Sequence, residues 1–351
     1  MKTLSVADLA QHESQVITSF FLVQGKEIRS TREGKPYLAL RLADRTGSVE
    51  ARLWDGVADI ESEFDRDDVV KVEALVESYR GRPQLKLKRV RRAQADEFTL
   101  EDYLATTAQD VEALYTELLE VARGLANPHL QQLLLAVLED PELAPRLKQA
   151  PGAKTLHHAY RGGLLEHVVS LCRLSKLAAQ NYPEMDLDLL LVGAVLHDLG
   201  KVYELSYERS LDYTTEGNLL GHIAIALELL GRKMDALPGF PAELRTLVQH
   251  MLLSHHGRLE FGSPVIPKLP EAVLLHYLDD IDSKMEAMRS SLAAAETAGR
   301  EGEWTDWNRS LERWLLRRDK FLAAEPPKAD SSQPGPRSLF DPETPAPSRE
   351  K

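Results

Sequence analysis

Apolar and polar residues alternate along the first quarter of the chain with the two-residue period of half-buried β-strands. In residues 46–56 (TGSVEARLWDG), for example, the apolar side chains face one way, while Glu50, Arg52 and Trp54 face the other. The pattern predicts five strands, which lie at 16–30, at 37–45, at 46–56 and twice within 68–92. A short helix is expected at 58–64, between the third strand and the fourth.

After this β unit the apolar residues recur every three or four positions, which is typical of amphipathic helices. Asn127-Pro128 and Pro141 interrupt the spacing and separate the first helical stretches. Later helices are predicted at 163–180, 187–203, 219–236, 241–255, 270–289 and 303–322. The last of them carries a Trp-rich stripe, which favours core or subunit packing over a ligand site.

These patterns predict a multidomain α+β protein, in which a five-stranded β-barrel precedes an all-α helical bundle. The expected segments are an N-terminal segment (1–15), a barrel domain (16–95), a helical connector (96–154), a helical domain (155–290), a C-terminal helical extension (291–323) and a tail (324–351). The tail is rich in Pro, Ser and charged residues, a composition that predicts disorder. A length of 351 residues agrees with about two principal domains.

The composition favours a globular protein and argues against a membrane-spanning or disulfide-bonded one. With 43% hydrophobic and 28% charged residues, the chain is typical of globular proteins with a real core. The longest apolar run, 189–196, is far shorter than the ~20 residues that span a bilayer, and the N-terminus has no apolar segment of signal-peptide length. The single cysteine, Cys172, excludes an intramolecular disulfide and favours a reducing compartment. We therefore expect a cytoplasmic protein with no membrane partner.

The order of five strands with a helix between the third and fourth is that of the OB-fold, a barrel that commonly binds single-stranded nucleic acid. A net charge of −12 argues against binding by bulk charge, but residues 80–92 hold seven basic residues and no acid. The candidates for stacking on bases or holding phosphates are Tyr37, Trp54, Tyr79, Arg80, Arg82, Lys86 and Lys88. The alternative is that the aromatic residues belong to the barrel core and the basic ones to a solvated strand face.

The helical domain contains a series of histidines and aspartates near helix ends or on apolar faces. They are His167, His197, Asp198, His222, His255, His256 and Asp279. One buried histidine is more often a satisfied core residue than a ligand. Seven such groups are different, because burying each without a partner costs about 1–3 kcal/mol. A divalent metal gives all of them a partner, and mixed His and Asp ligands suit Mn²⁺, Fe²⁺, Co²⁺ or Zn²⁺.

The ligands exceed the needs of one ion. If Asp198 bridges, His167, His197 and Asp279 are expected to hold one ion. His222 and His255 are expected to hold a second, with His256 either as a further ligand or as a residue behind the ligands. Two ions about 3.5–4 Å apart are an arrangement for hydrolysing phosphate esters.

The ordered set H…HD…H…HH…D, with "HDLGK" at its centre, resembles the HD-domain metal-dependent phosphohydrolases. The stretches "AYRGGLLEHV", "LLSHHGRLEFGSPVIPKLPEA" and "LHYLDDIDSKM" resemble, more narrowly, the YhaM-type 3′→5′ exoribonucleases, over about residues 16–320. That resemblance implies an N-terminal OB-fold followed by an HD domain. It also implies a phosphodiester hydrolase that releases nucleoside monophosphates from the 3′ end of single-stranded RNA. Two divalent ions, Mn²⁺ first among them, are implied as cofactors. The ligands that the resemblance implies are His167, His197, Asp198, His222, His255 and Asp279, and His256 is a ligand or a residue behind the ligands.

Two further groups of residues are assigned roles near the reaction. Asp198 is expected to be catalytic, and Lys201, one helical turn later, to contact the phosphate; its alternative role is that of a surface lysine. His157, His158 and Arg161 are weaker candidates for the substrate mouth.

Other functions stay open at this point. HD domains also hydrolyse nucleotides and cyclic dinucleotides, and a non-catalytic adaptor that binds single-stranded nucleic acid is an alternative from another class. Single-stranded DNA is a second candidate substrate, and a homo-oligomer is left open.

Overall fold

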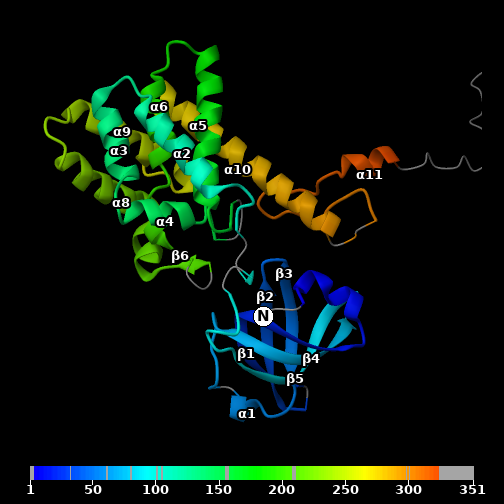
Figure 1. Cartoon of the computed structure of the whole chain (residues 1–351). Helices are drawn as coiled ribbons and strands as arrows, with labels where there is room; N and C mark the ends of the chain where they lie inside the picture. Colours follow the sequence, from blue (N-terminus) through cyan, green and yellow to red (C-terminus); the bar gives the residue numbers. More distant parts are fainter. Residues whose placement is uncertain are drawn as a thin grey trace, which may run out of the picture.

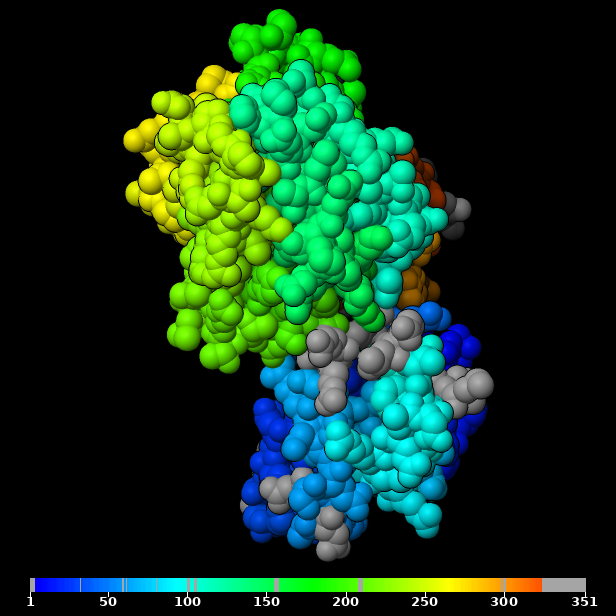
Figure 2. Space-filling model, turned by 60° about the vertical axis from the view of Figure 1, so that its left-hand side comes forward, coloured from blue at the N-terminus to red at the C-terminus, as the bar shows by residue number. Residues whose placement is uncertain are grey.

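A computed structural model describes residues 4–31, 33–60, 62–79, 81–99, 102–103, 106–154, 158–207, 211–297, 299 and 301–323. Figure 1 shows a β-barrel below and a group of helices above, with helix α10 extending away from that group. In the space-filling view the two parts form opposite ends of an elongated molecule (Figure 2). Asp212 links them, since it accepts hydrogen bonds from Arg66 of the barrel and from Lys154.

The five predicted strands form a closed barrel in the order β1-β2-β3-β5-β4. Its strands are β1 (Val16–Ser30), β2 (Pro36–Asp44), β3 (Gly47–Leu53), β4 (Val69–Tyr79) and β5 (Arg82–Arg92). Neighbouring strands are antiparallel except β3 and β5, which run parallel. The short helix α1 (Val57–Ile60) lies between β3 and β4, and a 3-10 helix, η1 (Val6–His12), precedes the barrel.

Alternation along the strands fills the barrel core. In β3, Val49, Ala51 and Leu53 are buried, whereas Glu50 is exposed and Arg52 half-buried, as the period of two predicts. Phe21 and Leu85 are among the largest side chains that are fully buried there. The prediction of an OB-type barrel is confirmed.

The helical part packs around α6 (Leu187–Leu196), in which every residue from Leu189 to Leu196 is buried. The other helices are α2 (Val111–Arg123), α3 (Pro128–Leu138), α4 (Leu143–Gln149), α5 (Gly163–Asn181), α7 (Lys201–Glu204), α8 (Thr215–Asp235), α9 (Ala242–Ser254), α10 (Pro270–Thr297) and α11 (Arg318–Ala323). A small hairpin of β6 (Leu205–Ser206) and β7 (Asp212–Tyr213) precedes α8, and a 3-10 helix, η3 (Leu259–Phe261), follows α9. Within the described residues, no helix is long and apolar enough to cross a membrane.

Two helix predictions are wrong. The predicted helix 187–203 is interrupted by a turn at 197–200 between α6 and α7. The predicted helix 303–322 is for the most part an irregular arm, closed by bridges from Trp304 to Leu316 and from Asn308 to Arg313, and only α11 at its end is helical. Leu311 and Leu315 of this arm pack on α10, so their apolar spacing reflects docking of the arm rather than a helix.

Candidate metal centre and nucleic-acid surface

The predicted metal ligands come from five helices and the turns that follow them. His167 lies on α5, His222 on α8 and Asp279 on α10, while His197-Asp198 and His255-His256 directly follow α6 and α9. His167, His197, Asp198 and His255 are each at most 3% exposed. Packing around α6 therefore gathers side chains that are up to 112 positions apart in the sequence, from His167 to Asp279.

Two glycines allow this assembly. A Cβ on Gly200 would lie 2.0 Å from the backbone oxygen of His222, so only glycine lets the α8 segment approach the turn after Asp198. Gly221 has φ 72° and ψ 158°, a region that is essentially restricted to glycine, and it breaks the helical path inside α8. The break turns His222 toward the other ligands.

Asp198 is at the centre of the cluster. Its Oδ2 lies 3.3 Å from His197 Nε2 and 4.0 Å from His167 Nε2. Its Oδ1 lies 3.4 Å from His222 Nε2 and 3.8 Å from His255 Nε2. The two carboxylate oxygens thus face two different pairs of histidines.

The ligand atoms fall into two groups. Those of His167, His197 and Asp279 lie within 4.8 Å of one another, and those of His222, His255 and His256 do the same. Asp198 lies between the two groups, which is the division that the sequence predicts for two ions.

The donor atoms fit a metal. Among the described residues, His197 Nε2, His222 Nε2, His255 Nε2 and His256 Nδ1 are buried and have no hydrogen-bond partner. The other ring nitrogens of two of them are fixed, because His197 Nδ1 donates to the carbonyl of Ala194 and His255 Nδ1 to that of Leu252. Since buried polar atoms without partners are costly, a divalent cation at these nitrogens explains the arrangement.

The charge states of the cluster are set by burial and by neighbouring charges. Burial, together with the nearby His197 and His256, holds the pKa of His255 well below its ordinary value, so this ring is neutral and ready to bind a cation. Burial also opposes protonation of His167, but hydrogen bonds with Asp279 and Asp282 outweigh it and raise its pKa to about 9. In the metal-free protein His167 therefore carries a proton at pH 7.

Lys201 lies inside the site and is not a surface lysine. Its ammonium donates to Asp198 Oδ2 at 2.6 Å and to the carbonyl oxygen of Gly152 at 2.7 Å. Burial raises the pKa of Asp198, but the positive charge of Lys201 and then His197 outweigh it and hold this pKa well below its ordinary value. Lys201 thus keeps the central carboxylate ionised.

A second layer of contacts holds the ligands from behind. Asp282 Oδ2 accepts from His167 Nδ1 at 2.8 Å and from His158 Nε2 at 3.1 Å, and its Oδ1 accepts from Ser170 Oγ. Glu204 Oε1 similarly lies 3.2 Å from His222 Nδ1. Ser170 and Glu204 were not among the predicted residues, because nothing in their local sequence shows that they meet a side chain from another helix.

Of the three residues predicted at the substrate mouth, the structure describes His158 and Arg161, and these two contact different partners. His157 lies outside the described residues. His158 is 3% exposed and faces Asp282, so its prediction as a mouth residue is wrong. Arg161 is half-buried and donates to Gln149, in a surface hollow formed by α2 and α4.

On the barrel, the three aromatic residues predicted to stack on bases meet at one place. Tyr37 and Trp54 are stacked with ring centroids 4.6 Å apart. Arg52 lies 5.9 Å from the ring centres of Tyr37 and Trp54 and 5.8 Å from that of Tyr79. These four residues form an aromatic platform on the barrel surface. Arg52 is its missed member, although the strand alternation had placed it on the same face as Trp54.

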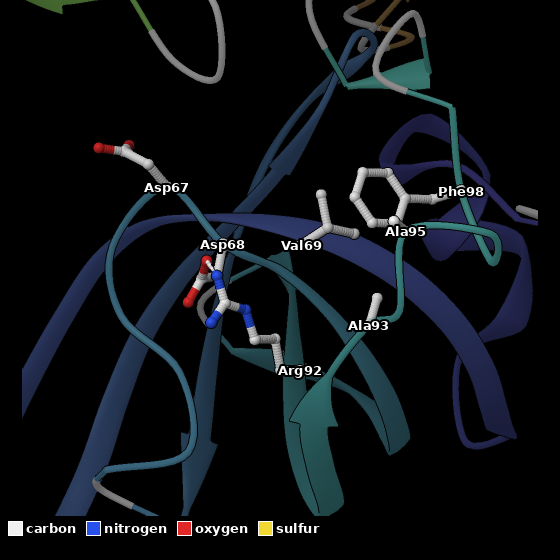
Figure 3. Close-up of a pocket in the computed structure, with 7 residues that line it drawn as sticks. All are labelled: Asp67, Asp68, Val69, Arg92, Ala93, Ala95 and Phe98. Carbon is white, nitrogen blue, oxygen red and sulfur yellow. Dashed lines mark hydrogen bonds and ion pairs between the residues drawn. The ribbon is translucent and has the colours of Figure 1, made fainter.

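The basic residues predicted at 80–92 differ in their surroundings within the part of the chain that the structure describes. Arg82, Lys86 and Lys88 are exposed on β5. In the register of the parallel strands, Lys86 on β5 lies opposite Arg52 on β3. Arg80 lies outside the described residues. Arg92, in contrast, forms an ion pair with Asp68 at 2.6 Å beside a pocket at the other end of β5, where Figure 3 shows the two side chains facing each other.

The chain is 37% identical over 303 residues to 3′-5′ exoribonuclease YhaM of Bacillus velezensis, a match that covers 86% of this chain and 94% of that protein. The chain belongs to the YhaM family of 3′-5′ exoribonucleases. The family model of the HD domain matches residues 164–284, and that of an OB-fold nucleic acid binding domain matches residues 23–93. All the predicted metal ligands fall within the first match, and the aromatic platform falls within the second.

Among solved structures, part of the chain matches the second OB-fold domain of replication protein A from Methanococcus maripaludis. The identity is 22%, the match covers 23% of this chain and 87% of that one, and the TM-score is 0.20. A replication protein A heterotrimer bound to single-stranded DNA matches at 15% identity over 27% of this chain and 83% of that one, with a TM-score of 0.23. These scores are too low to relate the whole fold to either structure.

As a YhaM-family member with an HD domain, the chain is expected to depend on a divalent metal, and the His and Asp groups described above can bind one. The OB-fold and the exoribonuclease relative together support binding of a nucleic-acid substrate.

Proposed function

We propose that this protein is a metal-dependent 3′→5′ exoribonuclease that removes nucleoside monophosphates one at a time from single-stranded RNA. The observation that carries the proposal is the buried cluster around Asp198, in which four histidines each direct a nitrogen without a hydrogen-bond partner among the described residues into one site. Such a cluster, in a chain 37% identical to a named exoribonuclease over most of its length, supports hydrolysis of a phosphodiester bond.

Two divalent ions are proposed as cofactors, with Mn²⁺ first and Co²⁺, Fe²⁺ or Zn²⁺ as alternatives. The support is the division of the ligands into two groups of three on either side of Asp198. When bound, such ions activate water and stabilise the leaving oxygen of a phosphate ester. In the balanced reaction, a water oxygen bonds to the last phosphorus. The bond to the 3′ oxygen of the preceding nucleotide breaks, and that oxygen takes up a proton.

The chain's own residues have distinct proposed tasks. Asp198 offers one oxygen to each ligand group. Lys201 is proposed to contact a non-bridging phosphate oxygen and balance its charge, and its ammonium, 2.6 Å from that carboxylate, supports this role. Asp282 and Glu204 fix the rings of His167 and His222, so that the opposite nitrogens face the site.

The barrel is proposed to hold the strand upstream of the cut. Stacking of bases on aromatic rings is independent of sequence, which suits a nuclease that must accept every nucleotide. The exposed Arg82, Lys86 and Lys88 supply positive charge for the phosphates beside the platform. Single-stranded DNA is a second proposed substrate, because neither stacking nor phosphate contacts require the 2′-hydroxyl.

The alternatives are weaker. A phosphohydrolase of nucleotides or cyclic dinucleotides would need neither the aromatic platform nor a basic strand. A non-catalytic adaptor would need no unpartnered histidine nitrogens in a buried site.

We also propose a homo-oligomer with Trp304, Trp307 and Trp314 in the contact, since each of these side chains is about half exposed. A cytoplasmic location is proposed from the single cysteine, Cys172, a buried free thiol.

The test is a gel time course with Mn²⁺ and 5′-labelled single-stranded RNA, with Asp198→Ala as the control. The proposal predicts a ladder that shortens from the 3′ end and is absent in the variant. RNA that stays intact with Mn²⁺, Co²⁺ and Mg²⁺ would contradict it. Turnover of mononucleotides or cyclic dinucleotides without any ladder would favour the first alternative.

A further inference from the structure

A hollow of about 400 Å³ opens directly beside the second group of metal ligands. His222 and His256 belong to its wall, and His222 Nε2 lies 3.4 Å from Asp198 Oδ1, so the hollow borders the cluster at these two rings. Most of the remaining wall is apolar, from Leu220, Ile223, Leu227, Leu253 and Pro264. Its volume is within the ordinary range of small-molecule sites.

The break at Gly221 creates this wall. Residues two positions apart on a regular helix point to different faces, yet Leu220 and His222 both line the hollow. They do so because the backbone of Gly221, at φ 72° and ψ 158°, leaves the helical path between them. The same feature that presents His222 to the cluster thus places an apolar side chain beside it.

Leu220 is 52% exposed in the free protein, and Phe261, next to the lining residue Gly262, is 59% exposed. Covering an apolar surface of this kind with a flat, weakly polar group removes it from water and lowers the free energy of the complex. We propose that the hollow receives the base of the 3′-terminal nucleotide, the one that leaves with the product. This assignment rests on the proposed exonuclease function.

The polar side chains of the wall determine whether the base can be recognised through hydrogen bonds. Glu204, one of the few polar side chains there, is already engaged by the backbone N–H and the ring of His222. His222 and His256 have nitrogens that belong to the metal cluster. Among the described lining residues, apolar contact therefore dominates, and the hollow accepts any base without reading its edge.

The experiment compares two single-stranded RNAs that differ only at the 3′ end, where one carries a normal nucleotide and the other an abasic ribose. Removal of that single terminal residue is followed under single-turnover conditions with Mn²⁺. Wild-type protein should remove the normal residue about tenfold faster than the abasic one at subsaturating protein, since apolar burial of a base contributes at this order.

Three variants sharpen the comparison. Leu220→Ala should slow removal of the normal residue several-fold and leave the abasic residue unaffected. Ala224→Phe, at an exposed lining position, should fill the hollow and bring the ratio of the two rates close to one. Leu219→Ala is the matched control, because Leu219 is 78% exposed, adjacent in sequence and not part of the wall, and it should keep the wild-type ratio.

The outcomes separate the two proposals. Equal rates on both RNAs with wild-type protein would overturn the assignment of the hollow and leave the exonuclease function standing. An equal loss of discrimination in Leu219→Ala and Leu220→Ala would also overturn it. If neither RNA is shortened, the proposed function fails, and the assignment fails with it.

Discussion

The buried cluster around Asp198 and the aromatic platform on the barrel are both built from side chains that sequence analysis had picked out, but their physical states differ. The cluster is enclosed, and its rings are fixed by carboxylates and carbonyl oxygens before any ion arrives. The platform is partly open to water, and its rings contact one another and Arg52. The first arrangement suits chemistry that tolerates little displacement, and the second suits a strand that must slide.

This comparison predicts that the two regions fail in different ways when they are altered. Substitutions in the cluster should abolish RNA hydrolysis and leave RNA binding intact. Substitutions in the platform should weaken RNA binding and leave the hydrolysis rate at saturating protein nearly unchanged.

The largest effect is expected for Asp198→Ala. This change removes the carboxylate that faces both ligand groups and should reduce the rate of RNA hydrolysis by about a thousandfold or more, equivalent to ~4 kcal/mol. A single-turnover assay measures the rate, and fluorescence anisotropy measures binding of a labelled RNA. Binding should stay within about twofold of wild type, and a parallel loss of both would contradict the division of tasks.

Asp282→Asn should have the next largest effect. The amide keeps one oxygen that can accept from His167 Nδ1 and His158 Nε2, but it has no negative charge and a weaker acceptor, so the His167 ring is held less firmly and loses part of its basicity. Metal affinity or activity should fall by about 10- to 100-fold. Asp280→Asn is the control, since Asp280 is on the same helix but forms an exposed ion pair with Lys284 instead of a contact with a ligand. Similar losses in both variants would indicate a general effect on α10.

Trp54→Ala should weaken binding of single-stranded RNA by about tenfold, toward the lower end of what stacking contributes per base, because Tyr37 and Tyr79 remain. The hydrolysis rate at saturating protein should change little. Binding is measured by anisotropy at two salt concentrations, with Tyr182→Ala as a control for the loss of an exposed aromatic residue. An unchanged affinity would remove the platform from the RNA path.

The smallest effect is on the pH dependence of metal binding. Because the pKa of His167 is raised to about 9 in the metal-free protein, an ion must displace its proton at pH 7. Metal affinity should therefore increase from pH 7 to pH 8 by less than tenfold, and the increase should end above pH 9. Calorimetry in two buffers of different ionisation enthalpy counts the protons released. Asp282→Asn should release fewer, and no release in the wild type would contradict the protonated state.

The sequence predicted what depends on local pattern. The strands followed from alternation, and the candidate ligands from polar residues placed after apolar helical turns. It failed where a local pattern admits two structures, as in 303–322, where the apolar spacing of a docked arm imitates that of a helix. It also missed contacts between distant helices. Neither the approach of Gly200 to His222 nor the bond from Ser170 to Asp282 leaves a trace in neighbouring residues.

The central claim is that two groups of ligands hold two ions around Asp198, and metal stoichiometry tests it most directly. Equilibrium dialysis of the metal-free protein against Mn²⁺, followed by elemental analysis, counts the ions on each chain. The account predicts two ions for the wild type, and one for His255→Ala, which removes a ligand from the second group only. One ion in the wild type, or two in the variant, would contradict it.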